Sequence, residues 1–464
     1  DFCLSRGLGD VYKRQIYMRI VIVGAGKLGY SIAQLLAEDQ YDVVVVEIDE
    51  KRREVVKNSL DVLTIGGNGC SPNTLDDPDI RDADVLIAST DSDEVNMVTC
   101  MMAKNYGVKH TVARIRNTEY ALTAKDLLNQ GMNIDLILNP ERITATEINH
   151  ILMTPSALDV DDFAEGKVRM FEARMSDASP YVGVPLKDLE IPKQILIAML
   201  FRRHKMIIPH GDDMLEPVDN VYFVGQQSAI KEFEETFVNT YEKIERVMII
   251  GAGRTGRFLA PMLEEQGLFV KVIEKNKDRC QLIAQKLENG IVLCGDGTDI
   301  DLLTEEGIAE ADVVICITED DKLNLLLALM AKHLGAKKTI VRVARNEYVE
   351  LMEKVGVDIV LSSRLLSSGE VLRFVRKGGI VSVSLLEGAK AEALEIILPD
   401  DCEVIGKSLK DIKLPRACLV CAVVHDNEAV VPNGNTVLYA GDRIIIFVKS
   451  EFVKRVMPFF ESRG

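Results

Sequence analysis

The sequence predicts an α/β protein with two doubly wound parallel sheets, each followed by a small α+β domain. Two observations carry this prediction. A glycine-rich hexapeptide that begins at Gly24 recurs at Gly251, at an offset of 227 residues (251 − 24). Each copy lies between two short apolar runs, which is the pattern of a strand, a tight turn and a helix that returns to a parallel strand. The chain therefore contains two Rossmann-type units in tandem.

In the first half, apolar runs of strand length alternate with helical periodicity. Residues 19–23 and 41–46 are near-continuous apolar runs on either side of a helix at 27–38. Strands of a parallel sheet are covered on both faces, so they are apolar throughout rather than alternating. The same pattern predicts a helix at 94–106 and further strands at residues 62–65, 85–89, 111–115 and 136–138.

The second half repeats this order. We expect its strands at residues 247–250, 270–273, 292–294, 313–317, 339–343 and 359–361. From the middle of each unit the alignment shifts to an offset of 228 residues (324 − 96), which matches Asn96 with Asn324 and Arg114 with Arg342. A chance motif does not reproduce matches over a whole domain, so the repeat indicates a duplication.

A second repeat, at an offset of 223 residues (406 − 183), pairs Gly183 with Gly406 and Pro192 with Pro415. These segments are shorter, are punctuated by proline and contain apolar runs at 221–224 and 444–448, which indicates small α+β modules. We predict a linker helix at 228–245 and a leader at 1–17 that is not part of the native protein, which then starts at Met18. The remaining boundaries are 18–140 and 246–364 for the parallel domains and 141–227 and 365–464 for the small ones.

Composition excludes several classes of protein. The formal net charge of −17 argues against nucleic acid as a partner, because a phosphate backbone is bound by clustered Lys and Arg. The apolar stretches are interrupted by charge before they reach the ~20 residues that a membrane-spanning helix needs. The nine cysteines are too dilute for a disulfide scaffold and favour a reducing cytoplasm.

Most of these cysteines lie in apolar or helix-like segments, where we expect reduced thiols that pack as small hydrophobic groups: Cys100, Cys280, Cys294, Cys316, Cys418 and Cys421. The spacing Cys418-x-x-Cys421 is found in zinc sites and redox pairs, but here it lies inside an apolar run, and neither Cys402 nor His425 completes a ligand spacing. We therefore predict no metal site.

The glycines of each hexapeptide predict a nucleotide site. Gly24 permits the tight turn, Gly26 lets a pyrophosphate approach the backbone, and Gly29 lets helix and strand pack closely, while amides at the helix N-terminus face the anion. An acidic residue, Glu47, follows 18 positions later (47 − 29) and can accept hydrogen bonds from ribose hydroxyls. Its carboxylate repels a 2′-phosphate, so NAD or an adenosine nucleotide is favoured over NADP. The equivalent residues of the second half are Gly251, Gly253, Gly256 and Glu274.

Further candidates lie where later strands end, since open sheets bind ligands at the carboxyl ends of their strands. Thr90 with Asp91 could line the ribose or the base edge, and Arg114 could reach a terminal phosphate or the nicotinamide side. Their counterparts are Thr318, Glu319 and Arg342. The alternative is that glycine turns close βαβ units without any ligand, and that these arginines pair with surface carboxylates.

The small domains offer no repeated residue that suits catalysis. No His, Lys or Tyr placed for proton transfer recurs in them, whereas a dehydrogenase needs a general acid or base beside its nucleotide domain. We therefore predict a ligand-gated assembly rather than an enzyme, because differential binding to two domain arrangements can be transmitted to a partner. The alternative is an NAD-dependent oxidoreductase in which both halves are catalytic.

The motifs together resemble those of the TrkA family, the nucleotide-binding subunits of bacterial Trk potassium uptake systems, from Met18 to nearly the C-terminus. The resemblance lies in the MRIVIVGAGKLG start, Glu47, the ADVLIASTDSDEVN stretch at 83–96, the ARIR run at 113–116 and the duplicated small domains. It implies two tandem RCK (KTN) units, each with a TrkA-N and a TrkA-C domain.

The resemblance further implies a cytoplasmic protein, peripheral on the inner face of the bacterial membrane, that forms a homo-oligomeric ring of four chains. This ring would gate a separate potassium-translocating membrane subunit in response to NAD(H) and ATP or ADP. The regulatory domain of a potassium efflux antiporter or channel is a third reading, which the missing pore-forming spans disfavour. Carried over by position, with the third glycine of each turn, the nucleotide contacts are Gly24, Ala25, Gly26, Lys27, Leu28, Gly29, Glu47, Thr90, Asp91 and Arg114, and Gly251, Ala252, Gly253, Arg254, Thr255, Gly256, Glu274, Thr318, Glu319 and Arg342.

Overall fold

The structure is a computed structural model. It describes residues 18–461 apart from 82, 118–119, 121–130, 154–158, 176–178, 203–204, 218, 239–243, 377–381 and 387–390. The predicted leader at 1–17 lies outside the described residues. In the described part of the chain, none of the helices has the length and apolar character that crossing a bilayer requires.

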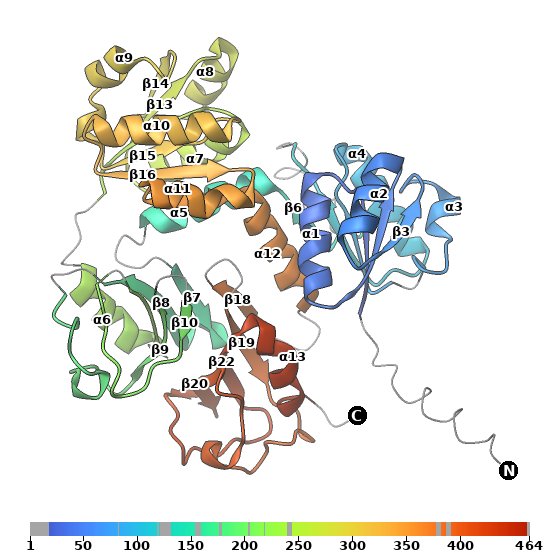
Figure 1. Cartoon of the computed structure of the whole chain (residues 1–464), viewed down its shortest axis with the longest axis vertical. Helices are drawn as coiled ribbons and strands as arrows, with labels where there is room; N and C mark the ends of the chain where they lie inside the picture. Colours follow the sequence, from blue (N-terminus) through green and yellow to red (C-terminus); the bar gives the residue numbers. More distant parts are fainter. Residues whose placement is uncertain are drawn as a thin grey trace. The chain divides into compact units, whose positions relative to one another are not determined.

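The first half forms a six-stranded parallel sheet with the strand order β3-β2-β1-β4-β5-β6 (Figure 1). Its strands are β1 (Arg19–Val23), β2 (Asp42–Glu47), β3 (Leu63–Gly66), β4 (Val85–Ala88), β5 (His110–Arg114) and β6 (Leu136–Leu138). Its helices are α1 (Lys27–Glu38), α2 (Glu50–Ser59), α3 (Pro72–Leu75) and α4 (Asp93–Asn105). The strand order reverses beside β1, which places a topological switch point between β1 and β4.

The second half repeats this sheet in the order β14-β13-β12-β15-β16-β17, which confirms the predicted pair of Rossmann-type domains. Its strands are β12 (Arg246–Ile250), β13 (Phe269–Glu274), β14 (Ile291–Cys294), β15 (Val313–Cys316), β16 (Lys338–Val343) and β17 (Ile359–Ser362). Its helices are α7 (Arg254–Glu265), α8 (Lys277–Ala284), α9 (Ile300–Glu305), α10 (Asp321–His333) and α11 (Val349–Val355).

Burial on both faces explains why these strands are apolar throughout. Successive side chains of a strand point to opposite faces of the sheet. In β12, Ile249 packs in one core with Leu259 of α7, whereas the adjacent residue Ile250 packs in another with Leu327 of α10. Each strand therefore contributes to two cores. The helices cover both faces of the sheet, so a ligand can bind at the carboxyl ends of the strands.

Each of the small domains, predicted as α+β modules, contains an antiparallel sheet. The first has the order β10-β9-β11-β8-β7, and the second has the order β18-β19-β22-β20-β21. Their elements are β7 (Asp159–Phe163), β8 (Val168–Arg174), β9 (Ile195–Arg202), β10 (Lys205–Ile207), β11 (Asn220–Gln226), α6 (Gln227–Val238), β18 (Ser382–Leu386), β19 (Ala391–Ile397), β20 (Cys418–His425), β21 (Glu428–Val430), β22 (Arg443–Lys449) and α13 (Val453–Val456).

The two small domains share one hydrophobic core. Tyr222 of the first and Phe447 of the second are both buried in it, and their ring centroids lie 6.4 Å apart. The backbone amide of Ala164 also donates to the Glu395 carboxylate at 3.1 Å, which links β19 to the turn after β7. The small domains of one chain therefore pair with each other.

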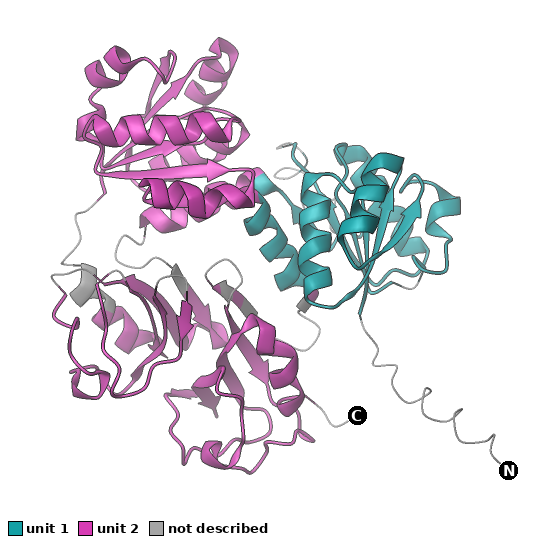
Figure 2. Cartoon of the chain, viewed as in Figure 1, with its two compact units in different colours: residues 1–140, 364–374 teal, residues 141–363, 375–464 magenta. Residues whose placement is uncertain are grey.

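The chain divides into two compact units that do not follow the order of the sequence (Figure 2). One unit consists of residues 1–140 and 364–374, and the other of 141–363 and 375–464. Helix α5 (Pro140–Met153) follows the first parallel sheet in the sequence, but its Ile148 is buried in the core of the second. Helix α12 (Ser363–Arg376) follows the second sheet, and its Phe374 packs edge-on to His110 of the first.

The segment expected as a linker helix belongs to the first small domain. Helix α6 buries Ile230 and Phe233, and Phe233 lies 5.3 Å from Phe223 of β11 between ring centroids. The periodicity of this segment indicates a helix but cannot tell whether its apolar side faces a neighbouring sheet.

Candidate functional site

A pocket of about 360 Å³ lies at the carboxyl end of the first parallel sheet, at its switch point. It brings together five of the predicted residues: Gly24, Gly26, Glu47, Thr90 and Asp91. It is also lined by residues that sequence reasoning did not single out: Ile48 after β2, Arg52 of α2, and Gly67, Asn68 and Gly69 after β3. The sequence placed its candidates at the glycine turn and the carboxyl ends of strands, and it did not single out the loop that follows the third strand.

The glycines of the first turn have different surroundings. Gly24 has a φ of 98°, a left-handed conformation that favours glycine. A Cβ atom added to Gly29 would lie 1.9 Å from the carbonyl oxygen of Gly24, so this position admits no side chain. A Cβ added to Gly26 would meet no atom within 4 Å. The turn thus needs Gly24 and Gly29 for folding, whereas Gly26 borders open space.

The N-termini of α1 and α7 have no side-chain cap. Gly26 and Gly253 are their N-cap residues, and neither helix is capped by a side-chain hydrogen bond. Helices α2 and α4, in contrast, are capped by Asp49 and Ser92. The first amides of an α-helix have no partner within the helix, and they carry the positive end of its dipole. Both glycine turns therefore present amides that suit an anion such as a phosphate.

Glu47 ties the end of β2 to the glycine turn. Its side chain is buried, and its carboxylate accepts hydrogen bonds from the Ala25 amide at 2.6 Å and from the Asp49 amide at 2.9 Å. The second half repeats this, because Glu274 accepts from the amides of Ala252 and Asn276 at 2.7 and 2.8 Å.

Ala25 and Ala252, which the resemblance places among the nucleotide contacts, have amides that are already hydrogen-bonded. In both halves this N–H already donates to a carboxylate. A carboxylate has about four lone-pair sites, and each of these two uses two of them within the protein, so capacity remains for ribose hydroxyls. The acid at the end of the second strand thus holds the turn as well as facing the pocket.

A buried asparagine, which the sequence comparison matched but gave no role, fixes the other wall. Asn96 accepts from the amide and the hydroxyl of Thr90 at 2.8 and 2.7 Å, and it donates to the carbonyl of Arg114 at 2.8 Å. Asn324 makes the same bonds to Thr318 and Arg342. The recurrence of this residue at equivalent positions was the signal that could have identified it.

Arg114 supports the wall of the pocket. Its guanidinium donates to the Thr90 carbonyl at 3.0 Å and lies 3.5 Å from the Asp91 carboxylate. Arg342 donates to the Thr318 carbonyl at 3.3 Å and to the Ser363 hydroxyl at 2.9 Å. Both side chains thus bond to the backbone behind the threonine.

The remaining predicted residues form the start of the two helices. Lys27 and Arg254 are exposed, whereas Leu28 and Thr255 are buried. Arg254 lies 3.9 Å from the Glu141 carboxylate. At Leu28 and Thr255 the side chain is buried, so that only the backbone amide is available to a ligand.

The equivalent residues at the carboxyl end of the second sheet, the candidate second cleft, form two ion pairs. Lys275 donates to Asp296 at 2.8 Å, and this bond, with two from Thr298, lowers the pKa of Asp296 to about 2. Arg279 lies 3.2 Å from Glu319. In the first cleft, the position of Lys275 is taken by Ile48, whose side chain is 71% exposed, and that of Asp296 by the neutral Asn68. The two clefts share their glycine turns but differ where the adenosine end of a nucleotide would lie.

The discounted cysteine motif contains free, buried thiols. Burial raises the pKa of Cys418 to about 12 and raises that of Cys421 well above the usual value of a thiol. In the described residues, no group of three or more His, Cys, Asp or Glu side chains is arranged to hold a metal ion. The expectation of a buried thiol is wrong for Cys294, which is exposed at the end of β14.

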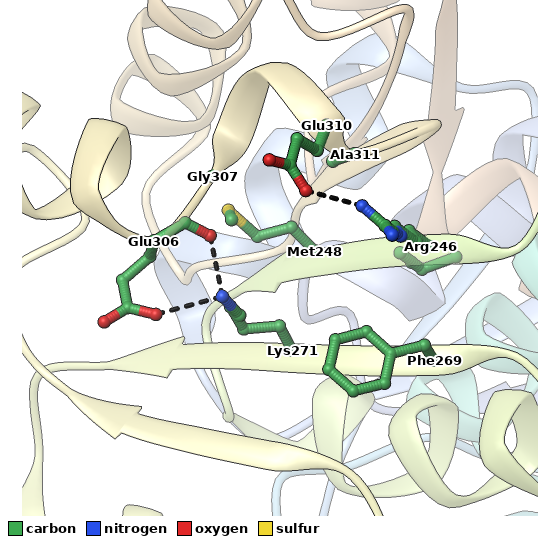
Figure 3. A pocket seen from close by; sticks show the side chains of 9 residues that line it. Arg246, Met248, Phe269, Lys271, Glu306, Gly307, Glu310 and Ala311 are labelled. Atoms are coloured by element: carbon green, nitrogen blue, oxygen red, sulfur yellow. Dashed lines mark hydrogen bonds and ion pairs between the residues drawn. The ribbon is translucent and has the colours of Figure 1, made fainter.

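A second pocket, of about 390 Å³, lies at the opposite, amino end of β12 and β13 (Figure 3). Lys271 donates there to the carbonyl and the carboxylate of Glu306 at 2.7 and 2.9 Å, and Arg246 pairs with Glu310 at 2.5 Å. Each cation is already matched by a carboxylate, and the glycine turn is at the other end of the strands. This pocket is therefore separate from the candidate nucleotide clefts.

Comparison with known families reproduces the repeat. The model of the TrkA-N domain matches residues 20–140 and 247–363, and that of the TrkA-C domain matches 170–238 and 393–461. The chain is 38% identical over 452 residues to Trk system potassium uptake protein TrkA homolog 2 of Methanosarcina mazei, with 96% of this chain and 100% of the relative covered. It is 33% identical over 453 residues to Trk system potassium uptake protein TrkA of Vibrio alginolyticus, with 96% and 99% covered.

Solved structures confirm the fold. The GsuK RCK domain superposes with a TM-score of 0.64 at 20% identity and covers 95% of this chain and 94% of its own. The GsuK channel bound to NAD gives a TM-score of 0.64 at 19% identity, with 95% of this chain and 78% of that chain covered. At this level of identity the likeness establishes architecture.

Proposed function

Since the chain belongs to the TrkA family of Trk system potassium uptake proteins, we propose that it is the nucleotide-sensing regulatory subunit of a potassium uptake system. The observation that carries this proposal is the same in both halves. An uncapped helix N-terminus and a buried glutamate lie together at the carboxyl end of a parallel sheet. This combination suits a ligand with a phosphate at one end and a ribose at the other.

The ligands that fit are NAD(H), ATP and ADP. The helix amides after Gly26 and Gly253 would hold the phosphates, and Glu47 and Glu274 would accept hydrogen bonds from ribose hydroxyls. A 2′-phosphate would place a second anion beside each carboxylate, which disfavours NADP. A GsuK channel bound to NAD and a GsuK bound to ADP are known among proteins with this architecture, which supports the choice of ligands.

The partner that we propose is a membrane potassium-translocating subunit of the Trk type. The chain would act from the cytoplasmic face of the membrane as a ring of four copies. A nucleotide shifts such an assembly only if it binds one arrangement of the domains more tightly than another. No catalytic step is required, and we propose that the protein has no enzymatic activity.

Calorimetric titration of the purified chain with NADH, NAD, ATP and ADP tests this proposal. We expect two sites per chain for at least one of these ligands. NADPH is the matched control, and we expect weaker binding than for NADH because of its 2′-phosphate. Steady oxidation of NADH by the protein alone would instead favour the NAD-dependent oxidoreductase.

A further inference from the structure

Two cysteines lie beside Glu274, at the end of β13. Cys280 is in the first turn of α8, and its thiol lies 3.2 Å from the carbonyl oxygen of Glu274. Cys294 ends β14 and pairs in register with Glu274 on the neighbouring strand. The amide of the next residue, Gly295, donates to the same Glu274 carbonyl at 3.0 Å. Both cysteines therefore adjoin the residue whose carboxylate holds the second glycine turn.

In the first half, the equivalent positions of the helix and the strand also lie close to each other. The equivalent of Cys280 is Arg53 (280 − 227), and the equivalent of Cys294 is Gly66 (294 − 228). A Cβ atom added to Gly66 would lie 2.4 Å from the guanidinium of Arg53. The contact between helix and strand is thus common to both halves, whereas the pair of thiols belongs to the second.

The two thiols differ in access to solvent. Of the eight cysteines in the described residues, Cys294 alone is exposed. Cys280 is 8% exposed, and burial together with the neighbouring Cys294 raises its pKa to about 11. A thiol reagent in solution therefore reacts with Cys294 first. Cys280 is then placed to react with the modified Cys294.

We propose that Cys280 and Cys294 form a disulfide that lowers nucleotide affinity at the second cleft. The Cys294 thiolate attacks a low-molecular-weight disulfide and displaces one thiol, which leaves a mixed disulfide on Cys294. Cys280 then loses its proton, attacks the Cys294 sulfur and displaces the second thiol. The protein thiols lose two electrons in total, and the reagent disulfide is reduced to two thiols.

The location of the bond predicts its effect. A disulfide would hold the two sulfur atoms about 2 Å apart, and Cys280 could no longer donate to the Glu274 carbonyl. This shifts the strand end that positions the Glu274 carboxylate and, two residues after Cys294, Asp296. We expect several-fold weaker nucleotide binding at the second cleft, while the first cleft, with Arg53 and Gly66 at these positions, is unaffected.

The cross-link is tested on the full chain by incubation with oxidised glutathione, alkylation under denaturing conditions and peptide mass spectrometry. We expect the peptides of Cys280 and Cys294 to be joined, with two hydrogen masses lost. Cys280→Ser should accumulate a glutathione adduct on Cys294, and Cys294→Ser should leave Cys280 as a free thiol. Recovery of both cysteines as alkylated thiols, or an unmodified Cys294 in the Cys280→Ser variant, would overturn the proposal.

The effect on binding is measured in a Gly26→Asp background, in which ADP is expected to bind at the second cleft only. This part rests on the proposed function. We expect ADP affinity to fall several-fold after oxidation and to recover with dithiothreitol, and Cys280→Ser/Cys294→Ser to show no response. Equal affinity of the cross-linked and reduced chains would overturn the coupling. If neither form binds any adenine nucleotide, the proposed function fails while the cross-link result still stands.

Discussion

Gly26 and Gly29 lie three residues apart in one turn, yet their surroundings predict opposite outcomes of substitution. An aspartate at Gly26 points into open space and places a negative charge where phosphate would lie, so Gly26→Asp should abolish binding at the first cleft and leave folding intact. An alanine at Gly29 would place its Cβ 1.9 Å from the Gly24 carbonyl oxygen and should cost about 1–3 kcal/mol of stability.

Urea unfolding and ADP titration of the two variants, side by side, check this pair. Unchanged nucleotide affinity in Gly26→Asp would remove the first cleft as a phosphate site. A Gly29→Ala variant as stable as the wild type would contradict the packing role of the third glycine.

Ile48 and Lys275 occupy equivalent positions and give the clefts different rims. An exposed isoleucine provides an apolar surface for an adenine ring, whereas Lys275 is already paired with Asp296. We expect Ile48→Lys to weaken ADP binding at the first cleft by about three- to tenfold, because the adenine then loses an apolar contact. The reciprocal Lys275→Ile, measured in the Gly26→Asp background, should strengthen the second cleft. Equal effects on inorganic pyrophosphate binding would contradict a contact with the base.

Which residues bind each other was the part that the sequence could not provide. Glu47 was predicted at the cleft from its place after the second strand, and it lines the pocket. Its hydrogen bond to the Ala25 amide depends on the rotamer and on the path of the turn, which no spacing encodes. Asn96 was visible only as a match between halves, since an asparagine in a helix pattern is usually solvated.

At the scale of elements, Asn96 joins three pieces of the first sheet. From α4 it bonds to Thr90 after β4 and to Arg114 at the end of β5. Asn96→Ala would leave these buried groups without partners and should cost about 2–4 kcal/mol. Asn105→Ala, at the exposed end of the same helix, is the matched control and should stay within about 0.5 kcal/mol. Chemical denaturation measures the loss of stability in both variants. Equal losses would contradict the role of Asn96 in joining these three elements.

The end of β20 contains a pH-dependent contact. The His425 ring nitrogen lies 2.6 Å from the buried Asp442 carboxylate, which raises the pKa of His425, and Asp426 lies 3.4 Å from the other nitrogen. A raised pKa means that the folded state holds the proton more tightly than the unfolded chain does. The stabilisation is therefore complete below about pH 6.5 and is lost as pH rises through the raised pKa.

We accordingly expect the Tm difference between wild type and His425→Gln to be largest in mildly acidic buffer and to shrink with rising pH. Differential scanning calorimetry over a pH series measures it. Asp442→Asn should remove the dependence. A Tm difference that grows toward alkaline pH would contradict the pairing.

The strands of both parallel sheets were predictable from the sequence because burial on two faces leaves a continuous apolar run. The expected strand at 136–138 coincides with β6, and that at 292–294 lies within β14. The packing partner of a helix was not predictable in this way. The apolar side of α5 looks the same whether it faces the sheet before it or the sheet after it.

At the scale of the whole molecule, the two halves exchange helices. Ile148 and Leu152 of α5 are buried in the core of the second parallel sheet, and residues 364–374 belong to the unit of the first. A fragment of residues 18–245 would expose that side of α5 and the shared core of the small domains. We expect it to aggregate or to unfold without cooperativity, and co-expression with residues 246–464 to restore a soluble complex. A fragment that alone shows the hydrogen-exchange protection of the full chain would contradict this.

The pairing of the two small domains within a single polypeptide has an evolutionary consequence. When identical subunits assemble, every mutation appears in each copy, so partner surfaces and ligand sites must change together. Here both partners are encoded separately in one reading frame. One lobe carries Cys280 and Cys294 where its twin carries Arg53 and Gly66. Because the two halves are joined in one chain, each half can change its sequence independently of the other and can take on a separate role.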